Sequence, residues 1–462
     1  MKQQNIENQL TRRDIVKLGL GGIASASLPS SLWLSGCSKW LPAKQSPHLF
    51  LVTVDTLRPD HLGCYGYTRS TSPNLDSFAA ESLLFKKCFS HAPVTGPSCS
   101  SFLTGFLPHE TTILNNSTRL PQVPTIAKLL KNAGYKTYGV VSNFVLRKKM
   151  GFGQGFDVYD DQMEDKELNR NSSERIAEKT TDKAIEMLQS HSEGPLFMWI
   201  HYQDPHGPYT PPQPYQTLFV DSDKPPHPLK IADKGGIPKY QKLGDHTDYH
   251  YYVSQYDGEI RYFDDQFGRL LTWLRNKGIY DNSTMIFTAD HGEAMGYGNY
   301  FFAHGQNLSN GLIHVPLIVK DPTARTGLRS DYVQHMDIVP TLLKAAGVRE
   351  EMSYRGRDLM THHPAPAPIC SELNVAGASL ILEGLKLLLY GRSAILFDID
   401  KDPREARNLA GDPAYRDRLN KMGQELIRLY TKEDFLKVKK PAETEILTEE
   451  EKNKLRSLGY LE

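Results

Sequence analysis

Three short stretches of the chain carry side chains that together could bind a cation and cleave an ester. Asp55 follows the apolar run LVTV, and Asp290 and His291 follow the apolar run MIFTA. Oxygen donors beside one imidazole suit a divalent cation such as Ca²⁺, Mg²⁺ or Mn²⁺. Thr95 lies in HAPVTGPSCSSFLTG, where a loop with a Gly-Pro turn leads into a helix. A cation at that place could bind the threonine oxygen, favour its alkoxide and orient it for attack.

Each of these residues also has a structural interpretation. An aspartate at a strand end is usually a cap or a turn residue, and a threonine before a helix is usually an N-cap. A loop that enters a helix N-terminus also collects anions, because free backbone N–H groups point outward there. The joint presence of two acids, one histidine and Thr95 favours the catalytic interpretation.

The elements that must position these residues alternate along the chain. HLFLVTV predicts a buried parallel strand that delivers Asp55 at its carboxyl end, the edge where open α/β sheets bind ligands. The same pattern recurs in the strands KTYGVVSN, PLFMWIHY, STMIFTA and HVPLIVK and in the helices VPTIAKLLKNAGY and QYDGEIRYFDDQFGRLLTWLRNKG. This order predicts an α/β fold with a large, mostly parallel sheet flanked by helices on both faces.

The pattern of apolar and polar residues changes after residue 348. The short alternating segments LKLLLYG and SAILFDI predict a small antiparallel sheet, and a charged helix is expected at about 413–431. The tail carries Thr448 and Glu451 at capping-box spacing, which predicts a short terminal helix. We therefore expect a catalytic domain at 47–348 and a smaller C-terminal α+β subdomain at 349–462.

Bulk composition narrows the class of protein. The 462 residues carry 54 Lys+Arg and 54 Asp+Glu, and this neutral balance argues against a nucleic-acid partner. The five cysteines form no CxxC pair, which argues against a zinc knuckle. We interpret Cys64, Cys88, Cys99 and Cys370 as free thiols in packed positions, with disulfides outside the cytoplasm as the alternative.

The N-terminal sequence has the pattern of an export signal. Arg12 and Arg13 precede a short, weakly apolar stretch, the pattern of twin-arginine export, and the stretch ends in LSGC at Cys37. This predicts a signal peptide over 1–36 and a tether over 37–46, with export by the twin-arginine machinery. Acylated Cys37 would anchor the protein to a membrane on the periplasmic face, the outer membrane in a Gram-negative cell because Ser38 is not Asp. A plain signal peptide with an incidental cysteine is the alternative.

Several segments, in order, give the chain a family resemblance. VDTLRPDHLGCYGY, PVTGPSCSSFLTG, DPHGPYTPP, TADHGE, HGQNL and MDIVPTLL are similar to motifs of the sulfatase family in the alkaline-phosphatase-like superfamily. The resemblance covers essentially residues 47–462. It implies that Asp55, Asp290 and His291 are metal ligands and that Thr95 stands at the nucleophile position. It also implies the positions of three further residues near the transferred group: Asn116, which would hold a substrate oxygen, His206, and His304, which would serve the leaving group.

The departures from the family pattern favour one branch of its chemistry. Sulfatases carry Cys or Ser followed by x-Pro-x-Arg, whereas this chain has Thr95 at the first position and Cys99 at the last. A threonine cannot become formylglycine, so none is expected. Ser142 and Phe144 stand where sulfatases carry a sulfate-gripping Lys and His, and Thr56 stands where a second acidic ligand is common. The site has thus lost cations that a sulfate ester would need.

The resulting hypothesis is a metal-dependent ester hydrolase with one divalent ion. A phosphodiester, cleaved or transferred through a covalent Thr95 intermediate, is the favoured substrate, because a site with few positive side chains suits a monoanion. An envelope lipid or polysaccharide head group is the expected source of that ester. A sulfuric ester hydrolase that works without formylglycine is the first alternative, and a catalytically inactive binding protein is the second.

Overall fold

A sheet of eight strands in the order β14-β2-β13-β10-β1-β7-β3-β4 forms the centre of the fold. The computed structural model describes residues 46–431 apart from 170–172, 222, 350–352, 364, 365 and 375. All neighbouring strands in the sheet are parallel except the two pairs that β13 makes with β10 and β2. The strands are β1 (His48–Val54), β2 (Leu83–Phe89), β3 (Lys136–Val140), β4 (Val158–Asp160), β7 (Leu196–Tyr202), β10 (Ser283–Ala289), β13 (His314–Lys320) and β14 (Gly327–Gln334).

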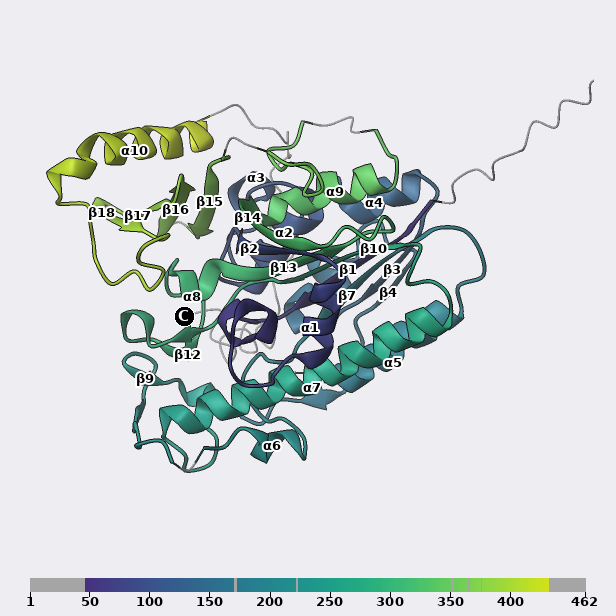
Figure 1. Ribbon diagram of the computed structural model, residues 1–462, viewed down its shortest axis with the longest axis horizontal. Helices are drawn as coiled ribbons and strands as arrows, with labels where there is room; N and C mark the ends of the chain where they lie inside the picture. The colour runs from purple at the N-terminus through teal and green to yellow at the C-terminus, as the bar shows by residue number, and fades with distance from the viewer. Residues whose placement is uncertain are drawn as a thin grey trace, which may run out of the picture. The chain divides into compact units, whose positions relative to one another are not determined.

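Helices cover both faces of this sheet, as Figure 1 shows. One face carries α1 (Pro73–Ala80), α5 (Ala177–Gln189) and α7 (Tyr249–Asn276), and the other carries α2 (Thr95–Thr104), α4 (Ile126–Asn132) and α9 (Ile338–Ala345). Because both faces are covered, every residue of β7 and β10 is buried, which explains why these strands read as continuous apolar runs. The predicted mostly parallel α/β architecture is confirmed.

The long helix α7 begins earlier than its apolar spacing predicts. Asp248 precedes it, and its carboxylate accepts hydrogen bonds from the backbone N–H groups of His250 and Tyr251 at 2.8 and 3.1 Å. This N-cap accepts hydrogen bonds from N–H groups of the first turn that have no partner within the helix. The helix therefore starts at Tyr249 and includes the aromatic stretch that follows.

A four-stranded antiparallel sheet follows toward the C-terminus, as predicted. It consists of β15 (Ile369–Leu373), β16 (Gly377–Leu382), β17 (Leu385–Tyr390) and β18 (Ser393–Asp398) in sequence order, with α10 (Arg416–Thr431) close to β16 and β17. The short elements are α3 (Pro108–Thr111), α6 (Tyr215–Leu218), α8 (Asn310–Ile313), β5 (Asp165–Lys166), β6 (Ser173–Glu174), β8 (Lys230–Ile231), β9 (Gly236–Ile237), β11 (Ala294–Met295) and β12 (Phe301–Ala303).

Three sequence-based expectations concern residues outside the described ranges. The first is the signal peptide, the second is the tether with the acylated Cys37, of which the residues up to 45 lie outside, and the third is the terminal helix at Thr448 and Glu451. Among the residues that are described, no helix is long and apolar enough to cross a membrane.

A buried ion pair connects the C-terminal sheet with α8. The Lys386 ammonium on β17 is fully buried and donates to Glu405 Oε1 at 2.6 Å and to Asn310 Oδ1 at 2.9 Å. Glu405 Oε2 in turn accepts a hydrogen bond from the Asn310 backbone N–H at 2.8 Å. Each charged atom therefore has a partner, which a buried charge requires.

We expect Lys386→Ala to lower the free energy of unfolding by about 3–5 kcal/mol, because it leaves the Glu405 carboxylate buried without its counter-charge. The matched control is Lys87→Ala, which removes a partly exposed pair with Asp400 and should cost less than about 1 kcal/mol. Urea unfolding of both variants measures the difference. Equal losses in the two variants would show that the Lys386 pair does not stabilise this junction.

Candidate active site

Three neighbouring strands bring the predicted acids to one edge of the sheet. β10, β1 and β7 are adjacent and parallel, so their carboxyl ends lie together. The Asp55 N–H donates to the Tyr202 carbonyl at 3.0 Å, and the Asp290 N–H donates to the Val54 carbonyl at 3.1 Å. These bonds extend the strand ladders by one residue and fix both aspartates side by side.

Asp55, Asp290 and His291 form a compact, fully buried set of possible metal ligands. His291 Nε2 lies 3.7 Å from Asp55 Oδ1 and 3.6 Å from Asp290 Oδ2. Neither of these oxygens has a hydrogen-bond partner within the described part of the chain. Buried carboxylate oxygens without partners are costly, and a divalent cation among the three residues would satisfy them. The donor set therefore fits the divalent ion that the sequence predicts.

The electrostatics of the three residues also suit a cation. Burial and the neighbouring Asp290 carboxylate raise the pKa of Asp55, against the opposing effect of the Asn143 amide, which donates to Asp55 Oδ2 at 2.6 Å. Burial alone would raise the pKa of Asp290, but His291 and His201 lower it. Burial lowers the pKa of His291, and its Nδ1 lies 2.9 Å from the Gly292 carbonyl. That contact assigns the proton to Nδ1 and leaves the Nε2 lone pair facing the carboxylates.

Thr56 holds the orientation of Asp290 through a rare backbone conformation. Its φ of 54° lies in the left-handed region, which is costly for a β-branched residue. In this conformation its N–H donates to Asp290 Oδ1 at 3.2 Å, and its carbonyl accepts from the Tyr256 hydroxyl at 2.7 Å. Thr56 therefore acts on the site through its backbone, at the place where a second acidic ligand is common in the family.

Thr95 is the first residue of α2, and its hydroxyl faces the metal-ligand set. Thr95 Oγ1 lies 3.4 Å from His291 Nε2, and the residue is fully buried. The N-cap of α2 is Val94, and no side chain caps the helix. Ser98, on the same helix, donates to the Asp290 carbonyl at 2.5 Å and so ties α2 to the end of β10. The helix-cap interpretation of Thr95 is wrong, and its hydroxyl is available for chemistry.

Asn116 lies directly against the start of α2. Its Oδ1 accepts the Gly96 N–H at 2.6 Å, and its Nδ2 is buried with no hydrogen-bond partner in the described residues. A Cβ at position 96 would lie 2.9 Å from Asn116 Oδ1, so glycine is needed there for this close approach. The amide Nδ2 is thus a fixed donor that could serve an oxygen of a bound ester.

Two histidines close the other side of the group. The His304 ring centroid lies 4.7 Å from that of His291 and 5.1 Å from that of His206. His304 Nδ1 lies 3.2 Å from Glu293 Oε1, and Glu293 Oε2 accepts from the Tyr209 hydroxyl at 3.0 Å. The structure thus brings His206 and His304 to the site, and it adds the buried Glu293 as the residue that orients His304.

Two more residues border the site: sequence reasoning missed Asn143, and it interpreted His201 as a packed residue, with a supporting position behind the metal ligands as the alternative. Asn143 contacts Asp55, whereas Ser142 faces away and shares a 2.7 Å hydrogen bond with Thr180. His201 Nε2 lies 3.9 Å from Asp55 Oδ2 and 4.0 Å from Asp290 Oδ2. The signal available in the sequence was a polar residue, His201, directly after the apolar run PLFMWI.

The side chains around the two acids carry little positive charge. In the described ranges, the ion pairs of Asp55 and Asp290 involve only histidines. Phe144 is buried beneath the Arg147 guanidinium, 3.6 Å from its carbon to the ring centroid. Cys99 is fully buried, and burial together with Asp290 raises the pKa of its thiol. The residues at the positions of the family's Lys, His and Arg are Ser142, Phe144 and Cys99, and none of these side chains is a cation.

Fold and site together define a hydrolase of ester bonds in the alkaline-phosphatase-like superfamily. The sulfatase family profile matches residues 47–348, and the chain belongs to the sulfatase family. It is 25% identical to the uncharacterized sulfatase YidJ of Escherichia coli (strain K12), over 82% of this chain and 86% of that one. It is also 25% identical to the choline-sulfatase of Rhizobium meliloti (strain 1021), over 79% and 83% of the two chains.

A solved structure supports the same fold. The phosphonate monoester hydrolase of Agrobacterium radiobacter superposes with a TM-score of 0.68 at 20% identity, over 83% of this chain and 95% of that one. Sulfatase-family enzymes are typically metal-dependent, in agreement with the unpartnered carboxylate oxygens of Asp55 and Asp290.

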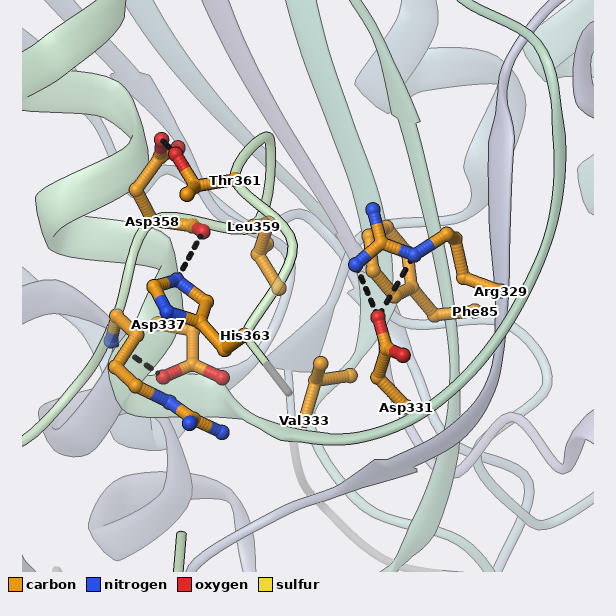
Figure 2. A pocket seen from close by; sticks show the side chains of 10 residues that line it. Phe85, Arg329, Asp331, Val333, Asp337, Asp358, Leu359, Thr361 and His363 are labelled. Carbon is orange, nitrogen blue, oxygen red and sulfur yellow. Dashed lines mark hydrogen bonds and ion pairs between the residues drawn. The ribbon is translucent and has the colours of Figure 1, made fainter. Parts of the chain in front are cut away.

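A separate polar pocket lies beside the edge strand β14 and shares no residue with the active site (Figure 2). Its volume of about 10 Å³ leaves room for roughly one water molecule. Within it Arg329 pairs with Asp331, and His363 Nε2 lies 3.0 Å from the Asp358 carbonyl. This pocket is too small for a substrate, but it contains a carboxyl group with a displaced pKa.

That group is Asp337, which burial holds at a pKa of about 7. An aspartate with a raised folded-state pKa binds its proton more tightly in the folded protein. The stabilisation that the protonated Asp337 gives the folded protein is complete below about pH 4 and is lost as the pH rises to 7. The free energy of unfolding should fall by up to ~4 kcal/mol over this interval. We expect Asp337→Asn, which does not titrate, to gain stability relative to the wild type over this interval. Urea unfolding across pH 4–8 measures it, and a pH-independent difference would contradict the assignment.

Proposed function

We propose that the protein is a metal-dependent phosphoesterase that cleaves or transfers a phosphodiester through a covalent intermediate on Thr95. The observation that carries the proposal is the buried Thr95 hydroxyl, which caps no helix and lies 3.4 Å from His291 Nε2 beside two aspartates. This is the arrangement that an activated hydroxyl nucleophile needs.

The proposed reaction consists of two in-line displacements. Thr95 Oγ1 gives up its proton to solvent and attacks phosphorus, and the Thr95–phosphorus bond replaces the bond to the leaving alcohol. His304, oriented by Glu293, gives a proton to the departing oxygen, with His206 as the second candidate. Water or an acceptor alcohol then gives a proton to His304 and displaces Thr95 from phosphorus, and the threonine oxygen regains a proton from solvent. A divalent ion held by Asp55, Asp290 and His291 would supply Lewis-acid stabilisation of the threonine oxygen.

The charge of the site supports a diester over a dianionic ester. Asp55 and Asp290 place two acids in the site, and within the described ranges the ion pairs around them contain only histidines. A phosphodiester brings one negative charge, whereas a phosphate monoester brings up to two. The monoanion therefore costs less to bind in a site with so few cationic side chains.

Sulfate ester hydrolysis is the second candidate, because the chain belongs to the sulfatase family and its relatives include a choline-sulfatase. A sulfate monoester is also a monoanion, so charge alone does not separate it from a phosphodiester. In that case Thr95 would act without formylglycine.

We propose an envelope lipid or polysaccharide head group as the natural source of the ester. A cavity of about 250 Å³ has Phe144, Arg147, Lys149 and Asp161 in its lining. Its two basic side chains, against one acid, suit an anionic head group. Export through the twin-arginine signal and a lipid anchor at Cys37 would bring the enzyme to such a substrate.

The experiment compares a nitrophenyl phosphodiester with a nitrophenyl sulfate, using the purified chain with Mn²⁺, Mg²⁺ or Ca²⁺. Metal-dependent turnover of the phosphodiester that exceeds turnover of the sulfate supports the proposal. Turnover of the sulfate alone would overturn it in favour of a sulfatase that uses Thr95. Turnover of neither ester, with metal bound, would favour an acceptor-dependent transferase or the inactive binding protein.

Asn116→Ala should lower kcat by roughly 10²–10³-fold, because it removes the Nδ2 donor that would hold a substrate oxygen in the transition state. Asn116→Asp is the matched variant, since it keeps an acceptor for the Gly96 N–H but has no amide donor. Steady-state kinetics should show a loss at least as large in Asn116→Asp. Full activity in Asn116→Asp would show that Asn116 only positions Gly96.

A further inference from the structure

A second group of metal-ligating side chains lies beside the first and consists of Cys99, His201 and Asp290. One ligand atom from each residue lies within 4.8 Å of the others, and all three side chains are fully buried. Cys99 follows Thr95 by four residues on α2, so the two side chains lie on the same face of the helix. His201 and Asp290 come from β7 and from the end of β10, the two neighbours of β1.

His201 is the observation that points to a ligand. Neither of its ring nitrogens has a hydrogen-bond partner within the described ranges, although the residue is fully buried. Its Nε2 lies 3.9 Å from Asp55 Oδ2 and 4.0 Å from Asp290 Oδ2, too far for hydrogen bonds. Two ligands of one zinc ion at the tetrahedral angle are ~3.4 Å apart, so an ion would need to draw His201 Nε2 and Asp290 Oδ2 together by about 0.6 Å.

The two groups differ in the atoms they use. Toward His291, Asp55 presents Oδ1, which has no hydrogen-bond partner, whereas toward His201 it presents Oδ2, which accepts from Asn143. Asp290 Oδ2 lies 3.6 Å from His291 and 4.0 Å from His201, so it is common to both groups. The group with His291 offers hard oxygens and one imidazole, whereas the group with His201 adds a sulfur.

The geometry points to a second metal site, in which Cys99, His201 and Asp290 bind a thiophilic divalent ion of the Zn²⁺ class and Asp290 is shared with the first site. Thiolate and imidazole ligands select such ions over Mg²⁺ and Ca²⁺. The ion would place positive charge beside Cys99, where the sulfatase pattern has an arginine. The site does not depend on Thr95 being a nucleophile.

Binding conserves atoms and charge without a redox step. The divalent ion replaces the Cys99 thiol proton, which passes to the solvent buffer, and a sulfur–metal bond forms. His201 contributes a lone pair of its neutral ring, and Asp290 contributes a carboxylate oxygen. The expected signature is therefore one proton released per ion in addition to any released at the first site.

Cobalt is the probe, because Co²⁺ substitutes for Zn²⁺ and a cobalt–thiolate bond gives a charge-transfer band in the near ultraviolet. The full chain, stripped with a chelator, is titrated with Co²⁺. We expect two ions per chain and the charge-transfer band in the wild type. Cys99→Ser should bind one ion without the band, whereas His291→Gln should lose the first ion and keep the band. Cys88→Ser, which alters another buried free thiol, should match the wild type.

The proposal is overturned if the wild type shows no charge-transfer band at saturation or if the band persists in Cys99→Ser. His201→Gln keeps the test decisive should Cys99→Ser fail to fold. Folded His201→Gln, checked by circular dichroism, should bind Zn²⁺ at this site at least about tenfold more weakly in calorimetry. Unchanged Zn²⁺ affinity and stoichiometry in that variant would contradict the second site, whatever the outcome of the ester assays.

Discussion

Thr95→Ala should lower phosphodiester turnover by at least about 10³-fold, because it removes the atom that forms the covalent bond to phosphorus. The side chain lies within hydrogen-bond range of His291 and caps no helix, so the fold should tolerate its loss. kcat, measured with saturating metal, should fall while thermal stability of the metal-free protein changes little.

Thr95→Ser is the matched control, since it keeps a hydroxyl at the same position and loses only a methyl group. We expect it to retain most of the activity. A Thr95→Ala variant that turns over at the wild-type rate would show that water attacks the ester directly. Equal losses in both variants would instead point to a structural role for the threonine methyl group.

Asp55→Asn should have two opposite effects, which together are characteristic of a metal site built from buried acids. It removes a ligand, so metal binding and activity should be lost. It also removes one of two neighbouring buried carboxylates whose facing oxygens have no hydrogen-bond partner among the described residues, so the metal-free protein should become more stable by on the order of 1 kcal/mol. The Asn143 amide can still donate to the new side chain.

Thermal melts with and without metal test both effects. The wild type should gain about 2.7 kcal/mol of stability at a metal concentration of 100 Kd, and Asp55→Asn should gain none. Asp257→Asn is the control, because that buried carboxylate is already paired with Arg69 at 2.8 Å and with His61 at 2.7 Å and should be destabilised by the change. A metal-free Asp55→Asn protein as unstable as Asp257→Asn would contradict the assignment of Asp55 as a ligand.

Residue patterns alone predicted the site residues that lie at the ends of strands. Asp55 and Asp290 each follow a buried apolar strand, and the carboxyl ends of parallel strands meet at one edge. Asn116, His206 and His304 came from family resemblance rather than from residue patterns. The structure places Asn116 against Gly96, His304 next to His291, and His206 next to His304.

Other features of the site and the sheet depend on tertiary structure and could not be predicted from local sequence patterns. His201, Asn143 and Glu293 reach the site because of strand order and loop paths, so their roles became visible only in three dimensions. Strand β14, with the sequence GLRSDYVQ, is half exposed at the sheet edge and lacks the apolar run that marks the inner strands. The reversed direction of β13 is likewise invisible in HVPLIVK, because both strand directions bury the same side chains.

The stereochemistry at phosphorus tests the central claim most directly. The substrate is a phosphorothioate diester of one configuration, hydrolysed in ¹⁸O-water with metal present. Two successive in-line displacements, the first by Thr95 and the second by water, predict net retention of configuration and no reaction with Thr95→Ala. Net inversion would mean a single displacement by water and would contradict the covalent Thr95 intermediate.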